Sequence, residues 1–268
     1  MSNHDSYRKH FFERGWCRFE FDEAIAAWIE SALPFARKAV VAEEFSRWLR
    51  CEGTWFVGVN ALPNRADGSV GTGPGLQGEL VDFIRQELYT DHFAWDAAQV
   101  SVFYPGYPRP KESESEKAFQ YRCRRDAAHV DGLLPEGDSR RRYLREHHGF
   151  ILGIPMVEYD QNTSPAVIWE GSQELVRSAL SKRFNGIAPG EWSHEDITDS
   201  YHAVRQQVFE QCNRVPIVAC PGEAYLIHRL AVHGVAPWRN GAVASADGRM
   251  ICYFRPEFLD ADGWLNSP

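Results

Sequence analysis

The sequence lacks the cysteine pattern of a disulfide-stapled protein. Its six cysteines are scattered, and no two of them form a C-x-x-C pair. The first residues do not resemble a signal peptide. Scattered thiols without such a signal are typical of reduced proteins, so we expect a cytoplasmic location.

The sequence also lacks a long apolar run and an excess of positive charge. No apolar stretch is long enough to span a bilayer. The formal net charge is -8, whereas binding to nucleic-acid phosphates needs a basic face. We therefore expect neither a membrane nor a nucleic-acid partner. The local arginine clusters at 122–125 and 140–142 are most simply solvated loop faces, and the alternative is that they meet an anionic substrate.

The 268 residues are predicted to form a single domain, 1–268, with a helical N-terminal part over about 1–95. Apolar residues recur at helical spacing in three segments of this part, and an aromatic and β-branched segment between them predicts a strand. The helices are expected over Phe21–Leu33 behind Asp22, about Phe35–Leu49 behind Pro34, and Leu80–Leu88, and the strand within Gly53–Leu62.

From about residue 97 onward, short apolar runs alternate with glycine, proline, asparagine and aspartate. These runs are Gln99–Tyr104, Gly149–Val157, Ala166–Trp169, Pro216–Cys220, Ala224–His228 and Met250–Phe254. Such spacing predicts an antiparallel sandwich or barrel, interrupted by helices over Ser172–Leu180 and roughly Glu195–Cys212. The predicted fold class is mainly β with flanking helices (α+β).

A candidate metal site begins at His129-Val130-Asp131. Residues two apart in a strand point to the same face, so His129 and Asp131 can bind one ion together. Two imidazoles and one carboxylate form the facial triad that holds Fe(II) and leaves positions open. His233, which is followed by Gly234, is well placed to supply the third ligand.

Several companions of this pair give the chain a family resemblance. They are the strand that ends in Tyr104-Pro105-Gly106, the segment Ala166–Gln173, the block Pro221–Pro237 and the apolar strand that Arg249 opens. With these features, roughly Gln99–Glu257 resembles the phytanoyl-CoA dioxygenase-like family of Fe(II)- and 2-oxoglutarate-dependent oxygenases. The chain departs from the family pattern in two places. It has Glu170-Gly171-Ser172-Gln173 where the family has P-G-S-H, and its stretch between His233 and Arg249 is longer than usual.

The resemblance implies a double-stranded β-helix (jelly-roll, cupin-like) core over about 97–258. It implies that His129, Asp131 and His233 are the catalytic metal ligands for Fe(II), and that Arg249 binds the distal carboxylate of the cosubstrate 2-oxoglutarate. The implied reaction uses O2 to oxidise a C–H bond of a small-molecule substrate, with release of succinate and CO2. Because related halogenases have a small residue at the carboxylate position, the presence of Asp131 favours hydroxylation over halogenation.

Some assignments keep competitors. His228 competes with His233 but ends an apolar run, where a histidine is often a satisfied core residue. Arg255 and Arg239 compete with Arg249 for 2-oxoglutarate, and Arg255 shares the strand face of Arg249 if no bulge intervenes. The neighbours His147 and His148 would point opposite ways in a strand, so we expect both at the surface.

Two other functions stay open. One is a cupin-type metal enzyme or zinc hydrolase that does not use 2-oxoglutarate, and the other is a non-catalytic jelly-roll binding module. The sequence does not determine the substrate or the oligomeric state. The loops expected to shape the pocket are 64–75, 108–125, 135–146 and 184–200, and their arginines are the sole pointer to an anionic substrate.

Overall fold

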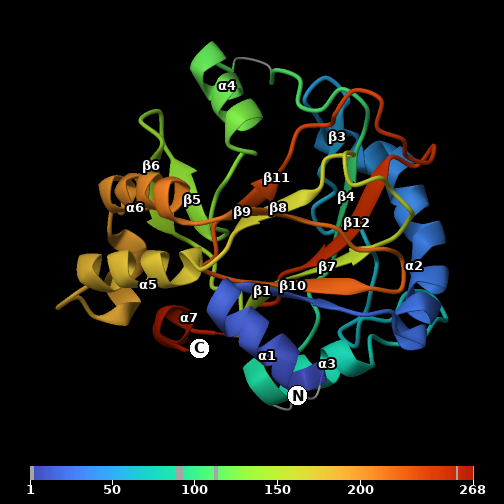
Figure 1. Ribbon diagram of the computed structural model, residues 1–268, viewed down its shortest axis with the longest axis horizontal. Coiled ribbons are helices and arrows are strands. Elements are labelled where there is room, and N and C mark those ends of the chain that lie inside the picture. Colours follow the sequence, from blue (N-terminus) through green and yellow to red (C-terminus); the bar gives the residue numbers. More distant parts are fainter. Residues whose placement is uncertain (1–2, 89–92, 112–113, 258, 268) are drawn as a thin grey trace.

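The computed structural model describes residues 3–88, 93–111, 114–257 and 259–267, so residues 112–113 of the polar loop expected over 108–117 lie outside the described ranges (Figure 1). The strands are β1 (Trp16–Phe19), β2 (Leu49–Arg50), β3 (Trp55–Phe56), β4 (Gln99–Phe103), β5 (Leu133–Glu136), β6 (Arg141–Leu144), β7 (Phe150–Pro155), β8 (Ala166–Trp169), β9 (Arg214–Ile217), β10 (Ala224–His228), β11 (His233–Val235) and β12 (Arg249–Phe254). The helices are α1 (Asn3–Arg14), α2 (Glu23–Val41), α3 (Glu79–Phe83), α4 (Glu116–Arg124), α5 (Ser172–Arg183), α6 (Thr198–Gln211) and α7 (Ala261–Asn266), with 3-10 helices η1 (Glu43–Trp48) and η3 (Pro189–His194) and a π-helix η2 (Ile84–Leu88).

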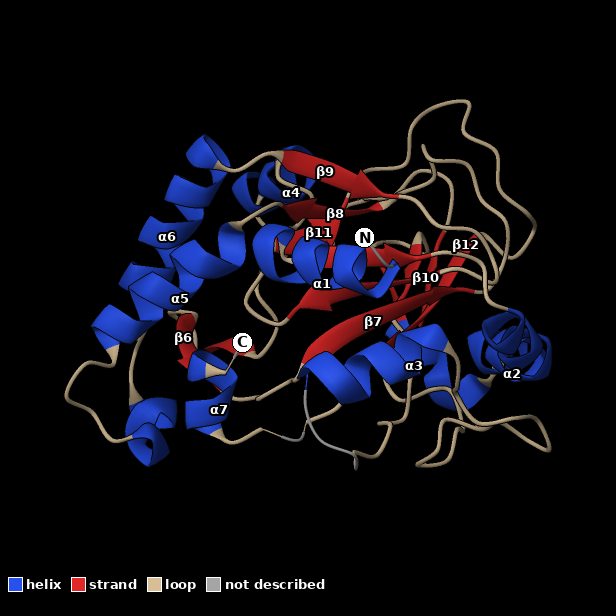
Figure 2. Ribbon diagram, turned by 60° about the horizontal axis from the view of Figure 1, so that its bottom comes forward, coloured by secondary structure: helices blue, strands red, loops and turns tan. Residues whose placement is uncertain are grey.

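Two antiparallel sheets form the core. The major sheet has the order β1-β10-β7-β12-β4-β3-β2, and the minor sheet has the order β11-β8-β9. Figure 2 shows β8, β9 and β11 on one side of the major sheet, and α2 and α3 on the other. The predicted jelly-roll class with flanking helices is therefore confirmed.

Alternation along the major strands separates the two layers of the core. In β12, Met250, Cys252 and Phe254 pack in the cluster that contains the residues of α2 and α3. Ile251 and Tyr253 face the opposite way and pack against β8 and β9 of the minor sheet. Side chains in a strand alternate between faces, and both faces are covered here, so β12 is buried along its whole length. The inner face, between the sheets, is the one that carries the candidate site.

The helical part differs from the expectation at Pro34. The two helices predicted on either side of it are one helix, α2, with Pro34 inside. Its buried stripe continues across the proline, from Trp28 and Ile29 to Ala36 and Ala39. A proline inside a helix removes one backbone hydrogen bond, but packing of a continuous apolar face stabilises the helix more than that bond does. Asp22 caps the start of α2 as expected, since its side chain accepts a hydrogen bond from the Ala24 N–H at 2.8 Å.

Other elements in the first third join the sheet rather than a separate helical layer. β1 pairs with β10 at one edge, and β3 pairs with β4 near the other. The strand expected within residues 53–62 is only Trp55–Phe56, and the helical pattern at 80–88 is α3 followed by η2. The helix α4 and the β5–β6 hairpin were not predicted, and they lie in two segments expected to be loops. Both are short and polar, so neither carries a buried periodic pattern.

None of the helices in the described ranges combines the length and the apolar character needed to cross a membrane.

Candidate metal centre

The backbone brings the two histidine segments into direct contact. The His129 N–H donates to the His233 carbonyl at 2.8 Å, and the His233 N–H donates to the His129 carbonyl at 3.0 Å. Gly234 allows this approach, because a Cβ at that position would lie 2.2 Å from the Asp126 carbonyl oxygen. Gly234, the glycine noted after His233 in the sequence, therefore permits a close contact between two backbone segments.

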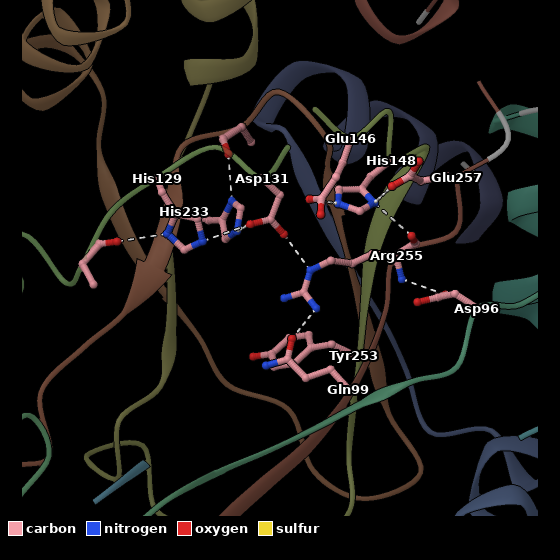
Figure 3. Close-up of polar contacts among 12 residues, drawn as sticks. Asp96, Gln99, His129, Asp131, Glu146, His148, His233, Tyr253, Arg255 and Glu257 are labelled. Atoms are coloured by element: carbon pink, nitrogen blue, oxygen red, sulfur yellow. Dashed lines mark hydrogen bonds and ion pairs between the residues drawn. The ribbon is translucent and has the colours of Figure 1, made fainter. Parts of the chain in front are cut away.

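The His129–Asp131 segment is not the regular strand that the sequence predicted. His129 forms an isolated bridge to His233, and Asp131 opens a turn in which Gly132 has a φ of +80°. Glycine is needed there, because a Cβ on Gly132 would also lie 2.3 Å from the Glu146 carbonyl oxygen. The side chains of His129 and Asp131 still point to the same side, as Figure 3 shows.

The three predicted ligands converge. Asp131 Oδ1 lies 3.0 Å from Nε2 of His129 and 3.6 Å from Nε2 of His233. One potential ligand atom from each of the three residues lies within 4.8 Å of the others. The structure thus places together all three side chains that the sequence analysis singled out, and it leaves His228 apart from them. His228 is fully buried, and its Nδ1 accepts a hydrogen bond from the Leu230 N–H at 3.0 Å.

Both imidazoles are oriented by carbonyl groups. His129 Nδ1 lies 2.9 Å from the Ala127 carbonyl oxygen, and His233 Nδ1 lies 2.9 Å from the Ala231 carbonyl oxygen. A carbonyl only accepts, so the hydrogen of each neutral ring is on Nδ1. The lone pairs on Nε2 then face Asp131 (Figure 3). Metal-binding histidines commonly have this outer hydrogen bond, which fixes the tautomer and the ring direction.

Asp131 is held by a cation from β12. Arg255 Nε donates to Asp131 Oδ2 at 2.6 Å, and Arg255 Nη1 donates to Gln99 Oε1 at 2.6 Å. Burial by itself raises the pKa of the Asp131 carboxyl, but the Arg255 guanidinium and the His233 imidazole together hold that pKa well below its usual range. Asp131 is therefore a carboxylate at neutral pH, which is the form that binds a metal.

Arg249 begins β12 and lies fully buried on the same inner face. Its Nη2 is 3.5 Å from the Tyr253 hydroxyl, and the rings of Phe103 and Tyr159 lie 5.6 and 5.4 Å from its Cζ. Its Nε and Nη1 have no hydrogen-bond partner among the described residues. Arg239, the other competitor, is exposed.

A cavity of about 720 Å³ opens over the three ligands. Arg249 is not among its lining residues, but Phe103 and Tyr253, which contact Arg249, are. Part of the cavity wall is aromatic and consists of Trp55, Trp95 and Tyr107.

The arginines that pointed to an anionic substrate are outside the cavity lining found in the described ranges. Arg122, expected in a solvated loop face, is instead buried and pairs with Glu114 at 2.6 Å. Arg122 is buried because it lies in α4, a helix that the sequence did not predict. Arg141 pairs with Asp196, and Arg142 donates to the Leu133 carbonyl.

The expectation of two surface histidines was wrong for His148. His148 is 8% exposed, and it lines the cavity. Its Nδ1 lies 3.0 Å from the Arg255 carbonyl oxygen, and its Nε2 lies 3.0 Å from Glu146 Oε2. Burial alone would lower the pKa of His148, but the hydrogen bond to Glu146 and the charge of Asp131 raise it above its ordinary value. His148 precedes β7 and forms an isolated bridge to Glu257, so no local pattern in the sequence marks its burial.

No protein-family model matches this sequence, and no curated protein matches it. Solved structures do resemble the fold. EvdMO1 matches with 12% identity and a TM-score of 0.50 over 96% of this chain and 50% of that chain, so the present chain spans half of its length. The epimerase SnoN in complex with Fe3+, α-ketoglutarate and nogalamycin RO matches with 14% identity and a TM-score of 0.48 over 95% of this chain and 83% of that chain. EctD from S. alaskensis with 2-oxoglutarate and 5-hydroxyectoine matches with 12% identity and a TM-score of 0.45 over 96% of this chain and 76% of that chain. At these identities the likeness shows the fold alone.

Proposed function

We propose that this protein is an Fe(II)- and 2-oxoglutarate-dependent dioxygenase that hydroxylates a C–H bond of a small molecule. The observation that supports this most is the convergence of His129 Nε2, His233 Nε2 and Asp131 Oδ1 at the floor of a cavity. Two imidazoles and a carboxylate are the donor set that suits non-haem Fe(II) and leaves positions open. All three atoms carry lone pairs in the protonation states that the surrounding hydrogen bonds impose.

The surroundings of Arg249 support a cosubstrate with a carboxylate. A buried guanidinium is normally paired, because a buried cation without a partner is destabilising. Nε and Nη1 of Arg249 are buried without a hydrogen-bond partner in the described part of the chain. A planar guanidinium offers parallel donors along each of two edges, Nε with Nη2 and Nη1 with Nη2, so the distal carboxylate of 2-oxoglutarate would satisfy one of the two buried nitrogens together with Nη2. A cupin-type enzyme that does not use 2-oxoglutarate would leave these two nitrogens unexplained.

In this proposal each residue has one task. Fe(II) with 2-oxoglutarate and O2 supplies the oxidising chemistry, with release of succinate and CO2. His129, His233 and Asp131 hold the metal from one side, and Arg249 fixes the direction of the cosubstrate. The aromatic wall of Trp55 and Tyr107 places the substrate and keeps water away from the reacting carbon.

The cavity also bears on the charge of the substrate. Four carboxylates line it in the described ranges (Asp96, Asp131, Glu146 and Glu257), against one arginine, Arg255. Arg255 and Asp131 neutralise each other and Glu146 pairs with His148, so the acidic groups that remain are Asp96 and Glu257. This favours a neutral or positively charged small molecule over the anionic substrate that the loop arginines had suggested.

Anaerobic titration tests the function directly. Addition of Fe(II) and then 2-oxoglutarate should produce the visible charge-transfer absorption of the chelate, and succinate should form when O2 is admitted. Asp131→Ala should abolish both. Full succinate formation by Asp131→Ala would show that the ligand assignment is wrong, and a wild-type protein without the absorption band would contradict the function itself. Steady decarboxylation of 2-oxoglutarate would count against a non-catalytic binding module.

A further inference from the structure

The side chain of Arg255 connects the candidate metal ligand to the sheet. Its Nε donates to Asp131 Oδ2 and its Nη1 donates to Gln99 Oε1, both at 2.6 Å. Its guanidinium also lies 5.1 Å from the ring centroid of Tyr253. These contacts come from β4, from β12 and from the turn after His129, and Figure 3 shows the guanidinium between them.

The backbone of Arg255 is fixed as well. Its N–H donates to Asp96 Oδ1 at 2.9 Å, and its carbonyl oxygen lies 3.0 Å from His148 Nδ1. His148 is in turn held by Glu146 through Nε2. Arg255 follows the last residue of β12 and precedes Pro256, a place where a strand end would otherwise be free to move. The result is a guanidinium whose position is set from both ends.

Asp131 consequently presents two different oxygens. Oδ1 is the one near Nε2 of both histidines, at 3.0 and 3.6 Å, while Oδ2 accepts from Arg255. A carboxylate can bind a cation through one oxygen or through both. A charge-assisted hydrogen bond to one oxygen makes the two unequal.

We propose that Arg255 is a positioning residue that keeps Asp131 Oδ2 off the metal, so that Asp131 binds through Oδ1 alone. This inference depends on the metal site proposed above. Held in this way, Asp131 would offer the metal one oxygen, and the three side chains would leave coordination positions open for a 2-oxo acid and O2. A second bond from Asp131 would take one of the positions that the cosubstrate needs.

The test compares Arg255→Gln and Arg255→Lys with wild type under anaerobic conditions. We expect Arg255→Gln to weaken 2-oxoglutarate binding to the iron-loaded protein by about 10- to 100-fold, the usual effect of losing a residue that orients a ligand, with a smaller change in Fe(II) affinity. Arg255→Lys keeps a cationic donor near Oδ2, so it should recover part of the loss. The readouts are the chelate absorption during titration and an Fe(II) binding isotherm.

A Co(II) spectrum separates this role from direct contact with the cosubstrate. In the Co(II)-loaded protein without 2-oxoglutarate, the visible absorption reports the coordination around the metal. Arg255→Gln should change it, because Asp131 becomes free to bind through both oxygens. Arg122→Gln is a matched control, since Arg122 is a buried arginine paired with a carboxylate outside the cavity lining, and it should leave the spectrum unchanged.

The outcomes are distinct. If wild type forms no chelate, the proposed function fails, and the role of Arg255 fails with it. If wild type forms the chelate and Arg255→Gln gives the same Co(II) spectrum and the same 2-oxoglutarate affinity, the positioning role alone is refuted. It is also refuted if Arg255→Lys folds but recovers nothing, or if Arg255→Gln loses Fe(II) as completely as Asp131→Ala does.

Discussion

The two ends of β12 carry buried arginines in opposite situations. Arg255, just past one end, has a carboxylate and an amide as partners and a fixed backbone. Arg249, at the other end, has two buried nitrogens without a partner in the described part of the chain and lies among aromatic rings. Tyr253 lies between them, since its hydroxyl is 3.5 Å from Arg249 Nη2 and its ring centroid is 5.1 Å from the Arg255 guanidinium.

The difference separates a cation paired within the protein, Arg255, from Arg249, for which we propose a cosubstrate carboxylate as the partner. Removing one partner of a buried ion pair leaves an uncompensated charge, whereas removing an unpaired buried charge relieves a cost. Arg255 should therefore contribute to the stability of the free protein, and Arg249 should contribute only when its ligand is bound.

The largest effect is expected at Asp131, the proposed metal ligand beside Arg255. Asp131→Ala removes one of the three proposed ligands and leaves the Arg255 guanidinium without its carboxylate. We expect loss of iron-dependent succinate formation together with a stability cost of about 3 kcal/mol, typical of a broken buried pair. Succinate release under air and urea unfolding of the metal-free protein measure the two effects. Unchanged stability would mean that the Arg255–Asp131 pair contributes nothing to the fold.

Arg255 and Arg249 should contribute differently to the stability of the metal-free protein. Arg255→Met leaves Asp131 buried and unpaired, so we expect the free energy of unfolding to fall by about 3 kcal/mol. Arg249→Met replaces an unpaired cation with an apolar side chain of similar length, so stability should stay the same or rise. Urea midpoints with matched slopes give the comparison. Equal losses in the two variants would contradict the distinction.

Binding of 2-oxoglutarate should make Arg249 important for stability, in contrast to its role in the metal-free protein. In the iron-loaded protein without O2, 2-oxoglutarate at about 100 times its dissociation constant should stabilise wild type by about 2.7 kcal/mol. Arg249→Met should lose most of this stabilisation. Arg249→Lys should keep part of it, because an ammonium supplies the charge without the two parallel donors. Thermal unfolding with and without 2-oxoglutarate tests this, and full stabilisation in Arg249→Met would move the cosubstrate assignment elsewhere.

The smallest effect concerns His228, the core histidine that competed with His233. Burial, together with the charges of Arg229 and Arg177, holds the pKa of His228 well below its ordinary value of 6.5. Below pH 6.5 the unfolded chain binds a proton at His228 and the folded protein does not. The free energy of unfolding is therefore at its full value above that pH and decreases as the pH falls. The expected slope is about 1.4 kcal/mol per pH unit. His228→Asn should flatten it, as urea unfolding between pH 7 and 5 would show, and an identical slope would assign the pH dependence to other groups.

The strands of the core could be predicted because their burial is local in the sequence. The run Gln99–Tyr104 alternates like a strand, Met250–Phe254 is apolar on both faces, and both runs are bounded by turn residues. α2 was harder, since Pro34 breaks the local pattern and only the packing of its apolar stripe shows that the helix continues. The helix α4 was missed because it is polar and its one buried arginine is satisfied by Glu114, a contact that no periodicity reveals.

The candidate site divides in a similar way. His129 and Asp131 could be found because they are two residues apart, and His233 because of the family resemblance and the glycine after it. His148 could not be assigned from its neighbours, because its burial depends on Glu146 and on the backbone of Arg255, which is distant in the sequence. Arg249 and Arg255 share a strand face, so the sequence left them as alternatives, and only their partners distinguish them.

The sequence by itself determined the types of donor atoms, the alternation of the core strands and the acidic balance that argues against nucleic acid, because these depend on residue identity and short spacing. The tertiary structure decided which oxygen of Asp131 faces the histidines, which arginine is paired and which is not, and that four carboxylates rather than the loop arginines reach the cavity lining. The physical reason is that hydrogen bonds and desolvation act between atoms that the fold brings within a few ångströms, from segments that lie about a hundred residues apart in the chain.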